Sequence, residues 1–172
     1  AGLNSNTAAT ASSMMDPVIA SKYYRVLKEA ADNGHAAAQC GVAMCLALGG
    51  GAAKPDEGFV KYFKMAADQG HALAQLNIAT FYESGIGYEK NDAEALRYYK
   101  RAADQGNAHA QCAVGILYGS GRYSNNDDSG IATDGGGSGG RYEEEAFRYS
   151  LLSANQGIPL AQSNVAICLH QG

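Results

Sequence analysis

The sequence predicts an all-α fold, a solenoid of stacked helix-turn-helix repeats, and three observations support this. A ten-residue motif, Ala-Ala-Asp-Asn-Gly-His-Ala-Ala-Ala-Gln in its first copy, occurs four times, with its glycine at Gly34, Gly70, Gly106 and Gly157. The intervals are 36, 36 and 51 residues, the last being one period plus 15 inserted residues. Apolar residues between the motifs recur at helical spacing. A constant period in this range is typical of supersecondary units stacked side by side.

Composition excludes several classes of protein. The 172 residues are 46% hydrophobic, enough for the core of one domain. No apolar run approaches the roughly 18 residues that a membrane span requires, so we expect no membrane span. The formal net charge is −4, and lysine and arginine are spread along the chain without a basic stripe. This distribution argues against a nucleic-acid partner.

The four cysteines occupy only two positions of the repeat. Cys40 is equivalent to Cys112, and Cys45 is equivalent to Cys168 once the insertion is removed. Other repeats place leucine or phenylalanine at these positions, so we expect small hydrophobic side chains, buried or half-buried. No Cys-x-x-Cys pair is present, which argues against zinc or redox chemistry. Reduced thiols favour a cytoplasmic location.

The N-terminal part divides into an arm and a first helix. Residues 1–15 carry no charge and no periodicity, and we expect a flexible arm. The solenoid is predicted to span residues 16–172. Asp16-Pro17 opens its first helix, because aspartate suits the N-cap and proline the first helical position. This helix is predicted to end at about Asp32, where Gly34 adopts a left-handed conformation.

The next helices follow from breaks in the helical pattern. Gly49-Gly50-Gly51 ends one helix, and Lys54-Pro55-Asp56 starts the following one. Asn91-Asp92 is predicted to cap another helix after the Gly85-Ile86-Gly87 turn. The helices predicted for this part of the chain cover approximately 35–47, 56–68, 71–84 and 92–104.

The third repeat begins like the second, with Gln111 and Tyr118 at equivalent positions. It is then interrupted by residues 124–141, whose glycine-rich and polar composition predicts a flexible loop. The repeat resumes with a helix at Tyr142, and a final helix is predicted over about 158–170. The chain should therefore contain about eight helices.

The repeat resembles a known family. Its pattern is similar to A-x-A-Q-x-x-L-G-x-x-Y-x-x-G-x-G followed by A-x-x-W-Y-x-x-A-A-x-x-G, the pattern of Sel-one-like repeats, which are 36-residue relatives of the tetratricopeptide repeat. The resemblance covers about residues 16–172 apart from the insertion. Three tyrosines stand where the family usually has tryptophan, which keeps an aromatic filler: Tyr62, Tyr98 and Tyr149. The resemblance implies a right-handed α/α superhelix.

The resemblance also implies a binding role, since the first helix of each unit lines the concave side of such a solenoid. By analogy with tetratricopeptide modules, Asn77 and Asn164 stand where an asparagine grips the backbone of a ligand. The equivalent positions of the other units hold Gly41 and Ala113, so such a clamp is incomplete. Four nearby candidates complete the predicted surface: Thr80, Met44, Ile116 and Ile167. The alternative is that these positions only pack.

No constellation of catalytic groups is visible. His35 and His71 directly follow the helix-ending glycine, which indicates a capping or surface role rather than catalysis. The glutamine of the motif recurs in every unit, and the family resemblance implies that its side-chain amide bonds the backbone between helices; its copies are Gln39, Gln75, Gln111 and Gln162. We therefore expect no enzyme, no cofactor and no metal site.

The predicted function is a non-catalytic protein–protein interaction scaffold or adaptor, with a protein partner. The alternative is a structural subunit held in a larger assembly through its edges, its arm and its insertion loop. The final helix has no partner helix in this sequence, so a contact at the uncapped C-terminal end is also expected.

Overall fold

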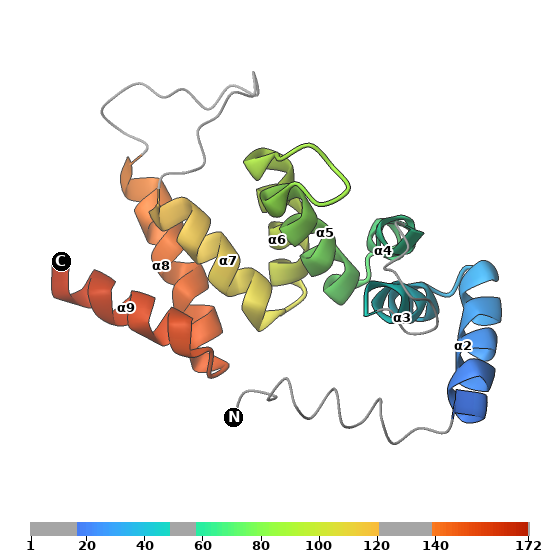
Figure 1. The fold of residues 1–172 in the computed structure, drawn as a ribbon. Coiled ribbons are helices and arrows are strands. Elements are labelled where there is room, and N and C mark those ends of the chain that lie inside the picture. Colours follow the sequence, from blue (N-terminus) through green and yellow to red (C-terminus); the bar gives the residue numbers. More distant parts are fainter. Residues whose placement is uncertain (1–16, 49–57, 121–138, 172) are drawn as a thin grey trace.

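The computed structural model describes residues 17–48, 58–120 and 139–171. This part of the chain forms eight α-helices and no strand, which confirms the predicted all-α solenoid (Figure 1). The helices are α2 (Pro17–Asp32), α3 (Ala36–Ala47), α4 (Gly58–Asp68), α5 (Ala72–Ser84), α6 (Asp92–Asp104), α7 (Ala108–Gly119), α8 (Gly139–Asn155) and α9 (Pro159–Gln171).

Two kinds of helix alternate along the solenoid. We call α3, α5, α7 and α9, which carry the Ala-x-Ala-Gln part of the motif, the first helices, and α2, α4, α6 and α8 the second helices. Each helix packs against the next one in the chain, and α7 also contacts α9. Figure 1 shows the helices following one another from α2 at one end of the molecule to α9 at the other. The described chain therefore starts on a second helix and proceeds through alternating pairs.

The turn between a second helix and the next first helix has the predicted geometry. Gly34 has a φ of 92° and Gly157 a φ of 86°, a left-handed conformation that a Cβ would disfavour. The backbone N–H of His35 then donates to the carbonyl of Ala30 at 3.1 Å, which closes the turn. One sequence signal, a glycine after the Asp-Asn or Asp-Gln pair, thus ends three of these four helices.

The core depends on small side chains where helices cross. Ala43 and Ala79 occupy one slot of the repeat and are both fully buried. Gly115 occupies the same slot in α7, where a Cβ would clash with Ser150 of α8. Aromatic residues fill the wider spaces, as in the edge-to-face contact of Phe63 with Phe81, whose ring centroids lie 5.5 Å apart. A continuous buried cluster therefore runs from α3 to α8.

Some predicted boundaries differ or lie outside the described residues. Helix α8 begins at Gly139, so the last three residues of the segment predicted as a loop, 124–141, are helical. A helix can extend over such residues because the first N–H groups of a helix need no intrahelical partner. The rest of that segment, the predicted arm 1–15 and the predicted helix start at Lys54-Pro55-Asp56 lie outside the described residues. Among the described helices, none combines the length and the apolar character that crossing a membrane requires.

Candidate binding surface

The glutamine of the motif connects each first helix to the second helix that precedes it. We call the side of a first helix that carries this glutamine its inner side. The Nε2 groups of three buried glutamines donate to alanine carbonyls of the preceding second helix, each at 3.2 Å: Gln39 to Ala31, Gln75 to Ala67 and Gln111 to Ala103. These three side chains are at most 5% exposed. Each bond adds a second donor to a carbonyl in the last turn of a helix, which also accepts from the backbone N–H of the glycine three residues later, as Ala67 does from Gly70. The predicted structural role of this glutamine is confirmed.

A second glutamine connects this contact to the end of the second helix of the same unit. Gln69 donates to the Oε1 of Gln39 at 2.7 Å, and Gln105 donates to the Oε1 of Gln75 at 2.8 Å. Gln156 donates to Gln111 in the same way, at 2.8 Å. The bonds to the alanine carbonyls therefore join successive units, and the bonds between glutamines join the two helices of one unit. Gln162, in α9, is exposed and donates to Ala154 at a longer distance of 3.4 Å.

The second helices are joined by charged groups and tyrosines. Lys28 donates to Asp32 at 3.0 Å and to the hydroxyl of Tyr62 at 3.0 Å, and Tyr62 donates to Asp32 at 3.2 Å. These hydrogen bonds raise the pKa of Lys28, chiefly through Tyr62, and lower the pKa of Asp32, chiefly through Lys28. At a later junction Tyr149 donates to Asp104 at 3.1 Å. A tyrosine of one second helix thus forms hydrogen bonds with charged groups of the preceding second helix.

The histidines of the motif lie at helix starts. His71 is the N-cap of α5, and its Nδ1 accepts from the backbone N–H of Ala74 at 3.3 Å. Asn107 makes the equivalent bond in α7, at 3.0 Å. His35 is the N-cap of α3 but its side chain makes no capping bond. The predicted capping role is confirmed for His71, and Asn107 shows that an amide oxygen can replace the imidazole nitrogen as the acceptor.

The exposure of each cysteine depends on how far neighbouring helices cover its own helix. Cys40 and Cys112 are buried and Cys45 is half-buried, and burial raises the pKa of all three thiols. Cys168 is exposed, contrary to the prediction of a buried or half-buried position. The reason is that, among the described residues, no second helix follows α9 and covers this side of it.

The outer side of the first helices forms one repeated surface, which we call the first-helix face. It comprises residues spaced i, i+4 and i+7 on each first helix, which lie on one side of a helix. Every member is exposed or half-buried: Ala37, Gly41, Met44, Leu73, Asn77, Thr80, His109, Ala113, Ile116, Leu160, Asn164 and Ile167.

All six residues predicted from the sequence to bind lie on this face. Met44 is 43% exposed and Ile167 is 55% exposed, whereas Ile116 and Asn164 are half-buried. The side-chain N–H of Asn77 donates to the carbonyl of Leu73 at 2.7 Å. The hydroxyl of Thr80 donates to the carbonyl of Leu76 at 3.0 Å and lies 3.2 Å from the hydroxyl of Tyr99. That contact commits Thr80 to the packing of α5 on α6.

Sequence reasoning missed two large apolar members of this face. Leu73 is 39% exposed and Leu160 is 55% exposed. Both precede the Ala-Gln pair of the motif and lie four residues before an asparagine. That spacing was the available signal, because residues four apart on a helix share a face.

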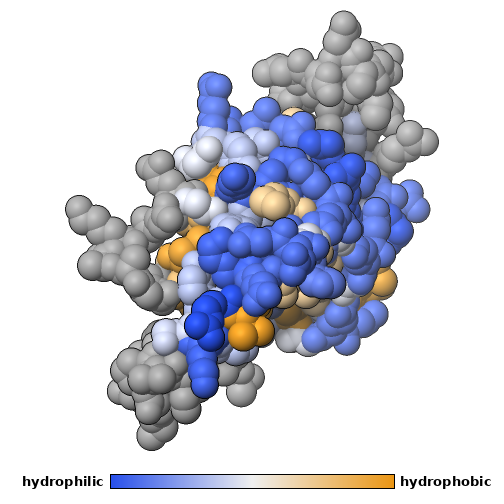
Figure 2. All heavy atoms as spheres, turned by 90° about the vertical axis from the view of Figure 1, so that its right-hand side faces the viewer, coloured by the Kyte–Doolittle hydropathy of each residue, from blue (hydrophilic) through white to orange (hydrophobic). Residues whose placement is uncertain are grey.

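Charge is distributed very unevenly between the two kinds of helix. Among the described residues, every lysine and arginine lies on a second helix except Lys90, which lies between α5 and α6. The first helices carry one carboxylate, that of Glu83, which accepts from the hydroxyl of Tyr99 at 2.8 Å. The first-helix face itself contains no aspartate, glutamate, lysine or arginine. Figure 2 faces the α2 end of the molecule, where hydrophilic residues dominate the surface.

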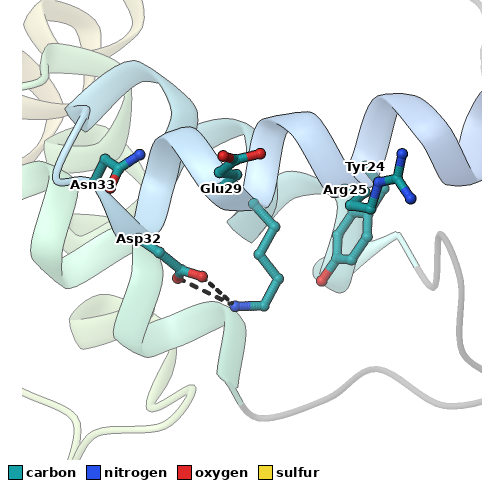
Figure 3. A pocket seen from close by; sticks show the side chains of 6 residues that line it. Tyr24, Arg25, Glu29, Asp32 and Asn33 are labelled. Atoms are coloured by element: carbon teal, nitrogen blue, oxygen red, sulfur yellow. Dashed lines mark hydrogen bonds and ion pairs between the residues drawn. The ribbon is translucent and has the colours of Figure 1, made fainter.

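A hollow of about 400 Å³ lies elsewhere, on α2. Its lining residues come from α2 and from Asn33, which directly follows it (Figure 3), and Lys28 forms an ion pair with Asp32 at 3.0 Å. The described residues contain no group of three or more histidine, cysteine, aspartate or glutamate side chains placed to hold a metal ion. The hollow is therefore the surface beside the junction of α2 with the next unit, and the first-helix face is the stronger candidate for binding.

Comparison with known proteins supports the repeat assignment. The model of the Sel1 repeat matches residues 36–71, 72–107, 108–132 and 135–158, together more than half of the chain. A crystal structure of a Sel1 repeat protein from Oxalobacter formigenes superposes with a TM-score of 0.69 at 25% identity, covering 87% of this chain and 54% of that one.

A second similar structure is a protective antigen of uropathogenic Escherichia coli strains that displays an SLR fold. It has a TM-score of 0.66 and 26% identity, over 81% of this chain and 27% of that one. This chain thus spans about half or less of the length of both proteins. No curated protein sequence matches it. The four matched repeats and the shared solenoid show that the chain belongs to the Sel1 repeat family.

Proposed function

We propose that this chain is a non-catalytic protein–protein interaction scaffold or adaptor that binds a protein partner on its first-helix face. Sel1 repeats generally mediate protein–protein interaction. The observation that carries the proposal is the recurrence of this face, at the same three positions, on all four first helices. A surface that repeats in register presents a partner with one extended row of contacts.

The division of contacts within each unit supports this assignment. The inner side of a first helix is occupied by buried glutamines such as Gln75, and the second helices are joined through groups such as Lys28 and Tyr62. The exposed side chains of the first-helix face, such as Leu160 and Ile167, are not needed for these junctions. Large apolar side chains gathered on an exposed surface are typical of an interaction site.

We propose a second contact at the C-terminal end of the described helices. Leu151 and Leu152 of α8 are 40% and 42% exposed, and Leu169 of α9 is 69% exposed. The equivalents of Leu151 in the earlier units are lysines, such as Lys28 and Lys64. We place the protein in the cytoplasm, which its free thiols favour.

The test is quantitative co-purification from extracts of the source cells with matched charge substitutions. Leu73→Glu places a carboxylate on the first-helix face, at the second residue of α5. The control, Ala93→Glu, makes the same addition at the second residue of α6, at an exposed position on a second helix. We expect Leu73→Glu to reduce partner recovery at least tenfold and Ala93→Glu to leave it unchanged.

Equal recovery by both variants would contradict the proposal. A third variant, Leu152→Glu, tests the contact at the C-terminal end. Loss of the partner with Leu152→Glu alone would favour a structural subunit held by its end over an adaptor that uses the first-helix face.

A further inference from the structure

We infer that this chain associates end to end with further copies of itself, so that α9 of one copy packs against α2 of the next and the two helices complete one repeat. The inference rests on the contact at the C-terminal end proposed above, and it identifies the partner there as the α2 end of a second copy. It does not involve the first-helix face.

The described helices begin and end on half of a repeat. A complete repeat is a first helix followed by a second helix, such as α3 and α4. Among the described residues, no first helix precedes α2 and no second helix follows α9. These two helices lie at opposite ends of the molecule (Figure 1). Each end therefore lacks the kind of helix that the other end offers.

The uncovered side of α2 exposes positions that α6 and α8 bury. Val26 is 62% exposed, whereas its equivalent in α8, Tyr149, is 4% exposed. Tyr23 is also exposed, whereas its equivalents Ala95 and Ala146 are buried. Tyr149 contacts the preceding unit, since its hydroxyl donates to a carboxylate of α6 at 3.1 Å. The exposed side of α2 is thus the side on which a second helix contacts the unit before it.

The uncovered side of α9 exposes positions that earlier first helices bury. Gln162 and Ala166 are exposed, whereas their equivalents in α5, Gln75 and Ala79, are buried. Cys168 is exposed at a position that is buried in α5 and α7. In a complete unit the following second helix packs on the first, as α6 packs on α5. The missing neighbour of α9 is therefore a second helix, which is what α2 is.

The amide contact of a complete repeat can form between two copies. Within one unit, the side-chain N–H of Gln105 donates to the Oε1 of Gln75 at 2.8 Å. Asn33, directly after α2, occupies the position of Gln105, and Gln162 of α9 occupies the position of Gln75. Both residues are exposed, and the amide of Asn33 carries the same kind of donor. Asn33 of the next copy can therefore donate to Gln162.

The two ends also match each other in the chemistry by which they differ from the internal junctions. At each internal junction the sequence places a lysine and an aspartate of one second helix beside a tyrosine of the next, as Lys28 and Asp32 hydrogen-bond a tyrosine of α4. In α8 the lysine and aspartate positions hold Leu151 and Asn155, and in α2 the tyrosine position holds Val26. Leu151 of one copy thus meets Val26 of the next, and neither leaves a charge without a partner. The contact continues the internal junction with an apolar pair in place of the polar one.

A contact between unlike ends does not close on itself. Each copy in a pair keeps one free α2 end and one free α9 end, so further copies can add, and the product is an open chain or a ring. Hydrophilic residues dominate the surface of the α2 end (Figure 2), so its apolar side chains form the centre of a contact with a polar rim. The mean mass should therefore rise with concentration without stopping at a dimer.

The experiment is sedimentation velocity of the purified full chain over roughly a hundredfold range of concentration. Val26→Glu places a carboxylate at the α2 end, and Leu151→Glu places one at the other end. The control, Ala93→Glu, adds the same charge at an exposed position of α6. We expect the original chain and the control to associate alike, and each end variant to lower the association constant at least about tenfold, because the carboxylate is desolvated without a partner.

A mixture of the two end variants tests which ends meet. Val26→Glu keeps an intact α9 end, and Leu151→Glu keeps an intact α2 end. We expect the equimolar mixture to form a dimer and nothing larger, which also shows that both variants are folded. Self-association of Val26→Glu alone would mean that like ends meet and would overturn the inference, as would a mixture that stays monomeric.

The outcomes separate this inference from the adaptor role. An original chain that stays monomeric at every concentration would overturn end-to-end association and leave binding on the first-helix face standing. A different protein seated at the α9 end of such a monomeric chain would give this surface another occupant and would overturn it too. Leu73→Glu should leave self-association unchanged, whereas loss of association with this variant would place the contact on the first-helix face and contradict the inference.

Discussion

The second helices carry nearly all the lysines and arginines of the described chain, whereas the first helices carry only the carboxylate of Glu83 among charged groups. The two kinds of helix also join the units differently. Second helices use exposed charged groups and tyrosines, as in the contact of Lys28 and Asp32 with Tyr62. First helices use a buried amide, as in Gln75. The difference shows that the first helices are joined to the stack through buried amides and the second helices through exposed polar groups.

The largest effect should come from removing an inner amide. Gln75→Ala deletes a buried side chain that donates to Ala67 and accepts from Gln105, and it leaves the Ala67 carbonyl with only the backbone N–H of Gly70 as a donor. We expect a loss of about 2–4 kcal/mol in the free energy of unfolding, measured by urea denaturation. The matched change Gln162→Ala, at an exposed residue, should cost less than about 0.5 kcal/mol. Similar losses for both would show that the contribution of this amide does not depend on its burial.

The next effect concerns the closest approach of a first helix to a second helix. In Gly115→Ala, the new Cβ would clash with the Oγ of Ser150 and lie 3.1 Å from the carbonyl oxygen of Ala146. We expect a loss of about 1–3 kcal/mol in stability from overpacking. Gly119→Ala is the control on the same helix, because its nearest neighbour, the Cβ of Ala146, lies 3.8 Å away. A melting temperature unchanged in both variants would show that this contact is loose.

A smaller effect is expected at the charged junction, and it depends on pH. The pKa of Asp32 is lowered in the folded protein, chiefly by Lys28, so the folded state keeps this carboxylate ionised to a lower pH than the unfolded chain does. The resulting stabilisation is complete above the unfolded pKa of about 3.9 and is lost as the pH falls through the folded value. Asp32→Asn should therefore lower the urea midpoint slightly at pH 7, with the difference from the original protein disappearing in acid. A difference independent of pH would exclude the ion pair as its cause.

The smallest effect should follow substitution on the first-helix face itself. Leu73 is 39% exposed and its side chain is not part of the inner contacts, so Leu73→Glu should change the free energy of unfolding by less than about 0.5 kcal/mol. By contrast, Ile78→Glu on the same helix, at a fully buried position, should prevent stable folding. Circular dichroism during thermal unfolding distinguishes the two, and strong destabilisation by Leu73→Glu would mean that the outer side also supports the fold.

The fold was predictable because the same sequence signals for helix ends and turns recur in each repeat. The motif around Gly34 encodes the end of one helix, the left-handed turn and the start of the next, and its 36-residue period specifies stacking. The structural role of Gln75 was implied by the resemblance to Sel-one-like repeats, and the capping role of His71 followed from its place directly after the helix-ending glycine. These contacts are local or lie between adjacent helices, so sequence spacing determines them.

The remaining features depend on which helices cover which surfaces. Cys112 and Cys168 belong to predicted apolar positions, yet the first is buried and the second exposed, because the extent of covering differs between α7 and α9. The bond from Gln105 to Gln75 joins residues 30 apart in one unit and forms only when α5 and α6 are packed together. The exposure of Leu73 likewise depends on packing, which the variable position of a motif does not reveal.

The most direct test of the central claim is site-specific photo-crosslinking in the source cells. A photoreactive residue at Ala37, on the first-helix face, is compared with the same residue at Ala93. Both alanines are exposed second residues of their helices, α3 and α6. If the partner binds the first-helix face, we expect position 37 to give a discrete crosslinked protein, which is lost when Leu73→Glu is added. We expect no crosslinked protein from position 93. Crosslinks from position 93 with none from position 37 would show that partners bind the second helices. That result would contradict binding on the first-helix face.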